Sequence, residues 1–261
     1  RVNNLKGNYE DVFDSLEEAG YNVEDGFVCP EAIAIKGGRA IEKNEAFLEG
    51  KITVQDESAM LVAPLLDVEE GQTVLDLCAA PGGKTTHIAE LLENTGEVRG
   101  FDIHAQKLEL IKENCDRLGL SNVTLGELDA TKLNADLVGL ADRVLIDVPC
   151  SGLGIIRKKP EIKWTKKRNE LKEIVNVQRD IMKNAWEYLK KGGVMIYSTC
   201  TLNKEENEEN IEWFLNKYKD AEIEPVFVGK GNNLKYDKMG TLTVLPNDYM
   251  DGFFIAKIKK N

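Results

Sequence analysis

From residue 73 to residue 200 the sequence repeats one pattern, in which a short apolar run of the strand type is followed by an amphipathic stretch of helix length. The strand-type runs cover residues 73–78, 97–102, 122–129, 143–150 and 192–200. Helix-type segments lie at 85–93, 104–118 and 170–189, and the connection at 130–140 is shorter and less regular. Because parallel strands need crossover connections, which cover both faces of a sheet, the pattern predicts a doubly wound α/β domain with a mostly parallel sheet.

The two ends of the chain depart from this pattern. Strand-type runs at 222–228, 241–245 and 253–258 have no helix between them, which predicts an antiparallel edge on the parallel sheet. Near the start we expect a strand at 2–6 and a helix at 9–19, with Asn8 as its N-cap and Gly20 as its stop. We therefore expect a small α/β subdomain over 1–50 and a larger domain over 51–261. Because the chain opens at Arg1 without an initiator Met, we also expect it to be part of a longer protein, with the subdomain truncated.

The formal net charge of −11 argues against indiscriminate binding to nucleic acid, because such binding depends on basic residues that neutralise phosphates. The segment 150–172 is a local exception, with a charge of +6 that leaves −17 for the rest of the chain. It contains Trp164 and directly follows a glycine-rich turn. A solvated surface and a contact with nucleic acid explain this segment equally well.

Several classes of protein are excluded or disfavoured by composition. No apolar run is long enough to span a bilayer and no signal peptide opens the sequence, so we expect a cytoplasmic protein without membrane association. The cysteines are five in number and scattered, without a C-x-x-C pair, so we expect free thiols. His87 and His104 have no ligand-type spacing, and we expect no metal.

The stretch VLDLCAAPGGKTTHIAE raises the question of a phosphate-binding loop. Gly83, Lys84 and Thr85 fit the loop that binds nucleoside triphosphates, but Cys78 stands where its first glycine should be. Asp102 ends the next strand-type run nineteen residues after Gly83, where a carboxylate can accept hydrogen bonds from ribose hydroxyls. With Asp129 after the third run, placed to meet an adenine edge, the pattern favours an adenosine ligand over a triphosphate.

For Asp102 or Asp129 alone, capping of a strand end would be the better explanation. Asp147, at the end of the fourth run, could also resemble the Mg²⁺-holding aspartate of NTPases. The dipeptide Pro149-Cys150 follows it at once, however, and suits nucleophilic catalysis better than phosphoryl transfer.

Two thiols, Cys150 and Cys200, end the fourth and fifth strand-type runs. These strands are neighbours in the commonest doubly wound order, so both thiols can face one pocket. We expect Cys29 and Cys115 to pack in the core, and Cys78 to line the glycine loop through its backbone. The residues themselves leave open which of the two thiols is a nucleophile.

Four ordered motifs, LDLCAAPGGKTTHIAE, DVPCSGLGIIRKKPEIKW, YSTCTL and DGFFIAKIKK, strongly resemble the Sun/Fmu group of S-adenosylmethionine-dependent RNA cytosine-C5 methyltransferases, most closely its bacterial ribosomal-RNA branch. The resemblance is dense over residues 50–261 and implies a Rossmann-like methyltransferase sheet. RVNNLKG and its helix look like the small RNA-binding subdomain of the group, whereas the extra helical domain of the ribosomal branch is absent from this sequence.

The resemblance also implies a role for each matching residue. Cys200 would attack C6 of the cytosine, Cys150 would help to release the product, and Asp147 would contact the ring near N3 and N4 and also the cofactor. S-adenosylmethionine would lie against Cys78, Ala79, Ala80, Pro81, Gly82, Gly83 and Lys84, with Asp102 at its ribose and Asp129 at its adenine. Arg157, Lys163 and Trp164 would contact RNA, although Trp164 could equally anchor the core.

The expected partner is ribosomal RNA presenting an unstacked cytosine, and the expected state is a monomer. The same chemistry on tRNA is an alternative within the family. A phosphate-loop NTPase and an inactive RNA-binding module are the alternatives from other classes. Cys78 and Asp102 argue against the NTPase, and the intact cysteine pair argues against the inactive module.

Overall fold

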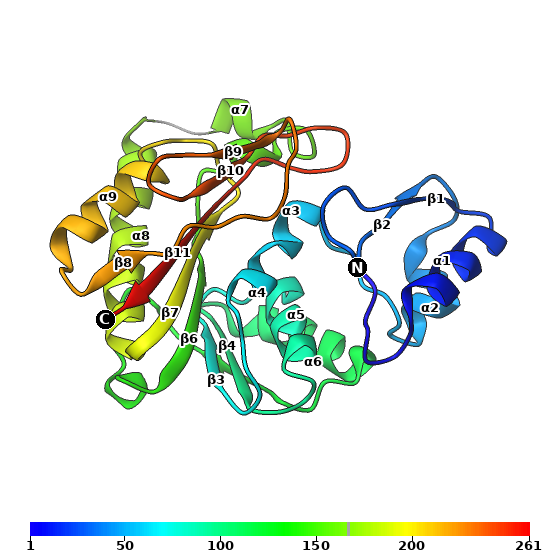
Figure 1. The fold of residues 1–261 in the computed structure, drawn as a ribbon, viewed down its shortest axis with the longest axis horizontal. Coiled ribbons are helices and arrows are strands. Elements are labelled where there is room, and N and C mark those ends of the chain that lie inside the picture. Colours follow the sequence, from blue (N-terminus) through cyan, green and yellow to red (C-terminus); the bar gives the residue numbers. More distant parts are fainter. Residues whose placement is uncertain (166–167) are drawn as a thin grey trace.

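The computed structural model describes residues 1–165 and 168–261, apart from the side chains of residues 163, 165 and 168. Its main feature is a nine-stranded sheet with the order β5-β4-β3-β6-β7-β11-β10-β9, in which β8 pairs with β11 (Figure 1). The parallel part consists of β3 (Thr73–Asp76), β4 (Glu97–Asp102), β5 (Val123–Glu127), β6 (Ala141–Asp147) and β7 (Leu189–Thr199). The five predicted runs are therefore confirmed as a parallel sheet, and the fourth and fifth strands are neighbours.

The antiparallel edge is also confirmed. Strand β11 (Phe253–Lys260) runs antiparallel to β7, and β10 (Leu242–Val244) pairs with it in turn. The predicted run at 222–228 is a strand only over β8 (Ala221–Ile223), and β9 (Leu234–Tyr236) was not predicted. Three-residue strands are too short to show a clear alternation of apolar residues, which explains both errors.

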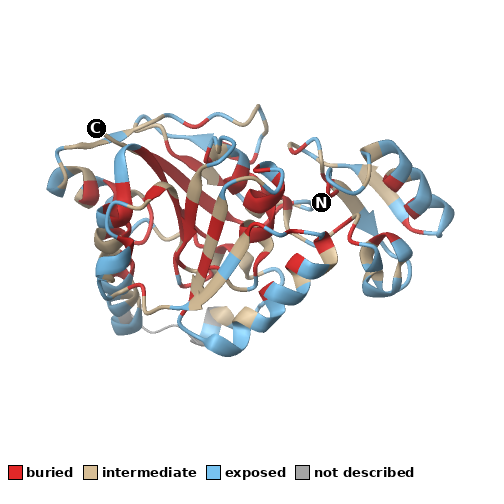
Figure 2. Ribbon diagram, turned by 90° about the horizontal axis from the view of Figure 1, so that it is seen from below, coloured by how far each residue is buried: buried red, intermediate tan, exposed pale blue. Residues whose placement is uncertain are grey.

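Helices cover both faces of the sheet. One face is covered by α3 (Glu57–Met60), α4 (Val62–Leu65), α5 (Gly83–Leu91) and α6 (Ala105–Leu118), and the other by α8 (Arg168–Tyr188) and α9 (Glu208–Lys217) (Figure 1). Successive strand residues point to opposite faces, so Val74 and Leu145 pack with α4–α6 whereas Leu75 and Ile146 pack with α8 and α9. Figure 2 shows the resulting buried strands between exposed outer helix surfaces. The irregular connection at 130–140 contains only a short 3₁₀ turn, η2 (Ala135–Leu137).

The N-terminal residues form a smaller unit that lies beside α5 and α6 in Figure 1. It contains α1 (Tyr9–Glu18), β1 (Asn22–Asp25), β2 (Ile33–Lys36), η1 (Ile41–Lys43) and α2 (Glu45–Leu48). Asn8 caps α1 by accepting from the Asp11 amide, as predicted. The predicted strand at 2–6 is wrong: Val2 makes a single bridge to Ile52, and Asn3 then starts a turn by accepting from the amides of Lys6 and Gly7.

Polar contacts attach this unit to the rest of the chain. Asn3 Nδ2 donates to the Leu118 carbonyl, and the Arg117 guanidinium donates to the carbonyls of Phe47 and Ile52. In α3 the buried Glu57 carboxylate accepts from three consecutive amides, those of residues 27, 28 and 29. Among the described helices, none is long and apolar enough to cross a membrane.

Candidate active site

The turn between β3 and α5 forms the floor of the candidate site. Gly82 adopts φ of 101°, and a Cβ there would lie 2.9 Å from a methyl carbon of Ile111, so only glycine fits without a shift. At the start of α5, the amides of Ala80, Gly83 and Lys84 donate to no acceptor in the described part of the chain. Free amides at a helix N-terminus bind carboxylate or phosphate groups. The turn can therefore receive an anionic or polar ligand.

The buried carboxylate of Asp76 supports this turn through a hydrogen bond with Thr85 in α5. Asp76 is fully buried and accepts from Thr85 Oγ1 at 2.7 Å. Burial raises the pKa of Asp76 to about 6. Its position beneath the turn makes it a structural support for the loop.

Asp102 and Asp129 lie at the ends of their strands, as the sequence predicted. Asp102 is 8% exposed, and its Oδ1 accepts from the His104 amide at 2.9 Å. Asp129 accepts from the amide and hydroxyl of Thr131 and pairs with Lys132 at 3.0 Å. Both carboxylates thus cap local backbone. The Oδ2 atom of Asp102 has no protein hydrogen-bond donor in the described residues and remains available to a ligand.

The two thiols predicted to share a pocket are in direct contact. Cys150 Sγ and Cys200 Sγ lie 3.3 Å apart and share a hydrogen bond, although the residues are 50 positions apart in sequence. The hydrogen bond shared with the Cys150 thiol, together with the positive charge of Lys84, lowers the pKa of Cys200, while burial and the negative charge of Asp147 oppose this shift. The same bond, together with burial, raises the pKa of Cys150. Because the thiolate is the nucleophilic form of cysteine, the lowered pKa favours Cys200 as the nucleophile of the pair.

The other three cysteines differ from this pair. Cys29 and Cys115 are buried, as predicted, and burial raises the pKa of both thiols. Cys78 is half-buried at the start of the β3–α5 turn, and burial also raises its pKa. Among the five cysteines, Cys200 is the one whose pKa is lowered.

A lysine and an aspartate meet beside the thiols. Lys84 Nζ donates to Asp147 Oδ2 at 2.6 Å, and Ser198 Oγ donates to Asp147 Oδ1 at 2.8 Å. Burial opposes the charge on Lys84, but Asp147 outweighs it and raises the pKa of Lys84. Since Lys84 is paired with a carboxylate and does not point freely into the turn, the arrangement differs from that expected of a phosphate loop.

The structure adds site residues that sequence reasoning missed. Ser198 orients Asp147, and Glu206 and Gln178 form a buried polar network behind the two thiols. The run TLNKEENEEN after Cys200 looks like the solvated start of a helix, so composition gives no sign that Glu206 is buried. The sequence signal that could have identified Ser198 as a site residue is its place at the end of a strand-type run, directly before Thr199 and Cys200.

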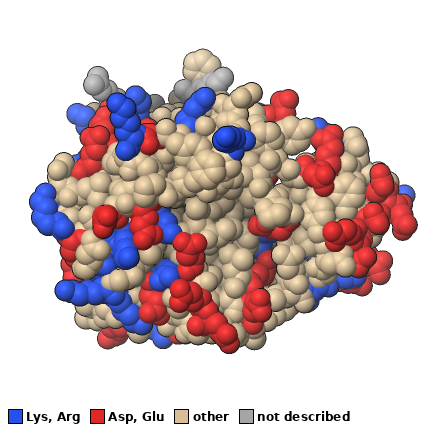
Figure 3. Space-filling model, in the orientation of Figure 1, with Lys and Arg blue, Asp and Glu red and all other residues tan. Residues whose placement is uncertain are grey.

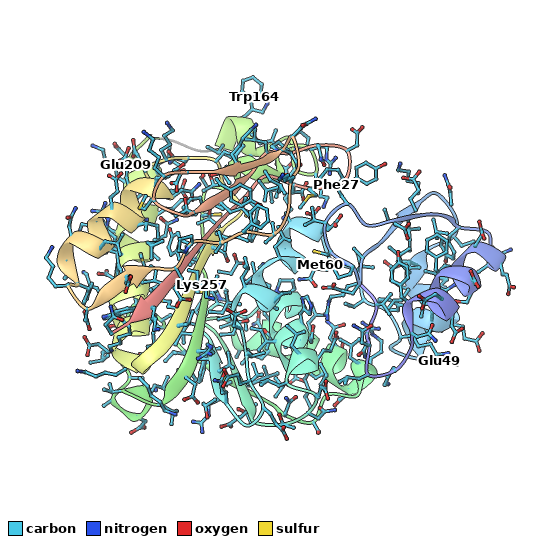
Figure 4. The ribbon with its side chains drawn as sticks, viewed as in Figure 1. Phe27, Glu49, Met60, Trp164, Glu209 and Lys257 are labelled. Carbon is cyan, nitrogen blue, oxygen red and sulfur yellow. The ribbon has the colours of Figure 1, made fainter. Side chains whose placement is uncertain are left out.

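The basic segment is only partly free to meet a ligand. Lys158 Nζ pairs with Asp56 at 2.7 Å and with Asp251 at 2.6 Å, and Arg157 contacts Asp251 at 3.4 Å. Trp164, in α7 (Ile162–Thr165), is 87% exposed and points away from the molecule (Figure 4), so the alternative of a core anchor is wrong. The side chain of Lys163, the third predicted RNA contact, lies outside the described residues, as do Lys166 and Lys167 entirely.

The chain is similar to known proteins over its whole length. The family described as 16S rRNA methyltransferase RsmB/F matches residues 63–259. A relative from Bacillus subtilis (strain 168), named probable ribosomal RNA small subunit methyltransferase B, is 40% identical over the whole chain, and a second of that name from Synechocystis is 38% identical. The chain spans 59% of the length of these curated relatives.

Two solved structures from Pyrococcus horikoshii show the same fold. A methyltransferase homolog protein superposes with a TM-score of 0.87 at 32% identity, covering 100% of this chain and 85% of the other. NSun6, solved with the S-adenosylmethionine analogue SFG, superposes with a TM-score of 0.84 at 25% identity, covering 100% and 89%.

Proposed function

This chain belongs to the RsmB/F family of 16S rRNA methyltransferases, and from that premise we propose that it methylates C5 of a cytosine in ribosomal RNA through a covalent adduct with Cys200. The observation that carries the proposal is the contact of two thiols at 3.3 Å beside a Lys84–Asp147 pair. C5 of cytosine is a poor nucleophile, and addition of a thiolate to C6 raises its electron density. The paired thiols suit that requirement.

The residues around the β3–α5 turn fit S-adenosylmethionine as the cofactor. The free amides of Ala80, Gly83 and Lys84 suit its methionine carboxylate, and the unpartnered Oδ2 of Asp102 suits its ribose hydroxyls. Asp129 would lie at the adenine. When bound, S-adenosylmethionine supplies an electrophilic methyl group to C5. A related structure that was solved with a cofactor analogue supports this assignment.

Different residues of this chain would then carry out the separate steps of the reaction. The Cys200 thiolate adds to C6, while Asp147, held by Lys84 and Ser198, contacts the ring near N3 and N4. Release requires that a base takes the C5 proton, so that the C5–C6 double bond forms again while the C6–sulfur bond breaks and Cys200 departs as a thiolate. The Cys150 thiol can stabilise that thiolate through the hydrogen bond that the two sulfurs share, since a donated hydrogen bond makes a better leaving group.

For the RNA we propose a single-stranded or looped segment, because the cytosine must leave its stack to reach a recessed thiol. Arg157, Lys163 and the exposed Trp164 would contact it beside the site. Methylation of tRNA by the same chemistry is the alternative. The names of the curated relatives favour ribosomal RNA.

Calorimetry separates the cofactor classes, because the proposal requires binding of S-adenosylmethionine and no binding of ATP. Activity is tested by incubating the chain with methyl-labelled cofactor and unmodified 16S rRNA or tRNA transcripts, followed by nucleoside analysis. We expect 5-methylcytidine in the 16S rRNA. Label in tRNA alone would favour the alternative, and label on another nucleoside would refute the proposal.

A further inference from the structure

Glu206 lies behind the two thiols and is completely buried, with 0% of its surface exposed. Its Oε2 accepts from the Ser151 amide at 2.9 Å and from Gln178 Nε2 at 3.0 Å. Its Oε1 accepts from Ser151 Oγ at 2.5 Å and from Asn203 Nδ2 at 3.0 Å. In the described part of the chain it forms no ion pair. A buried carboxylate without a cation is strongly destabilising unless hydrogen bonds satisfy both oxygens, as they do here.

These hydrogen bonds fix the backbone on both sides of Cys150. Ser151 follows this cysteine directly, and both its amide and its hydroxyl donate to Glu206. Gln178, in α8, donates not only to Glu206 but also to the carbonyl of Pro149, the residue before the cysteine, at 3.0 Å. The loop that carries Cys150 is therefore held at two points by one polar network.

The same network includes the segment after Cys200. Ser151 Oγ lies 2.7 Å from the hydroxyl of Thr201, the residue that follows Cys200. Asn203 and Glu206 belong to this segment and bond to each other through their side chains. Ser151 and Thr201, the residues that follow the two cysteines, thus meet each other directly, and Ser151 and Asn203 both donate to the Glu206 carboxylate.

We propose that Glu206 is the positioning residue that holds Cys150 and Cys200 in hydrogen-bond contact, a role that rests on the covalent mechanism proposed above. Glu206 acts on the thiols through their neighbours: Ser151 directly, Pro149 by way of Gln178, and Thr201 by way of Ser151. In this arrangement all four groups that face its oxygens donate to them, and a carboxylate accepts every one of these bonds, whereas the amide nitrogen of a glutamine could accept none of the two that it meets.

The Glu206→Gln variant tests this inference because its amide nitrogen cannot accept the two hydrogen bonds that the replaced carboxylate oxygen accepts. The measurement is the alkylation of each cysteine by iodoacetamide across pH, resolved by mass spectrometry, without RNA or cofactor. The charged groups that face the pair, Lys84 and Asp147, are unchanged in this variant. We expect the Cys200 profile to move to higher pH, with the rate below the midpoint falling about tenfold per pKa unit.

Two variants serve as controls. Glu205→Gln removes the same charge from the neighbouring exposed residue and should leave the Cys200 profile unchanged. Glu206→Asp keeps both acceptor oxygens and should restore part of the wild-type profile. If Glu206 served folding alone, folded samples of the three variants would not differ in their Cys200 profiles. Circular dichroism shows that each sample is folded before alkylation.

A folded Glu206→Gln protein with the wild-type Cys200 profile would overturn the inference. Should that variant not fold, Ser151→Ala takes its place, because it removes a single donor hydroxyl; an unchanged profile there overturns the inference equally. Failure of the positioning role can be distinguished from failure of the proposed function. A shifted profile in a chain that methylates no cytosine would refute the function alone, whereas methylation with an unshifted profile would refute only the positioning role.

Discussion

At the scale of single residues, Cys150 and Cys200 are chemically alike but differ in what surrounds them. Burial raises the pKa of both thiols, but the shared hydrogen bond lowers the pKa of Cys200 and raises that of Cys150, and the positive charge of Lys84 also lowers the pKa of Cys200. This direction agrees with the family resemblance, which makes Cys200 the nucleophile.

Opposite behaviour of two thiol variants tests that assignment. Cys200→Ser should abolish methylation and leave no covalent RNA adduct, because a hydroxyl without an activating base is a poor nucleophile at neutral pH. Cys150→Ala should allow addition but slow elimination, so that an enzyme–RNA complex survives denaturing electrophoresis. Cys115→Ala, at a buried thiol on α6, is the control and should keep activity. An adduct in Cys200→Ser and none in Cys150→Ala would reverse the roles.

A second residue, Asp102, both caps the turn after β4 and offers its Oδ2 to a ligand. Asp102→Asn can keep an oxygen for the His104 amide while losing the charge, so it separates these roles. We expect cofactor binding to weaken by about 1.5–3 kcal/mol, or roughly tenfold to a hundredfold, because charge-assisted hydrogen bonds to ribose hydroxyls are lost. Calorimetry measures this change. Affinity equal to that of the wild type would show that Asp102 only caps the strand.

At the scale of elements, hydrogen bonds to helices α3 and α6 attach the N-terminal unit to the rest of the chain. Glu57 in α3 accepts from the amides of Phe27, Val28 and Cys29, which form the turn between β1 and β2. Figure 4 shows Phe27 on this turn, at the side that faces the catalytic part. The unit has a small apolar core of its own, made up of Val2, Val12, Leu16, Tyr21, Ala46 and Ile52.

Removal of this carboxylate should therefore loosen the turn. We expect Glu57→Ala to lower the free energy of unfolding by about 1–3 kcal/mol, because it leaves buried amides without acceptors. Urea unfolding measures the loss, and limited proteolysis should cut faster within residues 26–31. Glu70→Ala, at an exposed position, is the matched control. Equal stability of the two variants would contradict the role of Glu57.

At the scale of the whole molecule, charge is distributed unevenly over the surface. Figure 3 shows several basic side chains along the upper margin, near the position of α7 in Figure 1, and many acidic side chains over the N-terminal unit at the right. Lys158 belongs to the basic segment but is paired with Asp56 and Asp251, so reversing its charge would disturb the fold as well as any RNA contact. Lys159 and Lys172 are exposed and suit a test better.

Reversal of both charges, in Lys159→Glu with Lys172→Glu, should weaken RNA binding and flatten its dependence on salt. The slope of log K against log salt should fall by about 0.7 for each lost contact with a single-stranded phosphate. Trp164→Ala should weaken binding without this change in slope, because stacking on a base releases no counterions. Filter binding at several salt concentrations measures both effects. Lys112→Glu, on the exposed side of α6, is the control, and an equal effect there would make the basic segment ordinary surface.

The sequence by itself determined the parallel strands, the presence of an antiparallel edge and the residues at the strand ends, because these follow from local patterns of apolar residues. It placed Asp102, Asp147, Cys150 and Cys200 correctly at one edge of the sheet. Tertiary structure decided which of these groups touch. The Lys84–Asp147 pair joins residues 63 positions apart, and the buried Glu206 comes from a run that looks solvated. Contacts of this kind depend on how distant segments pack, and no local pattern of residue types records that packing.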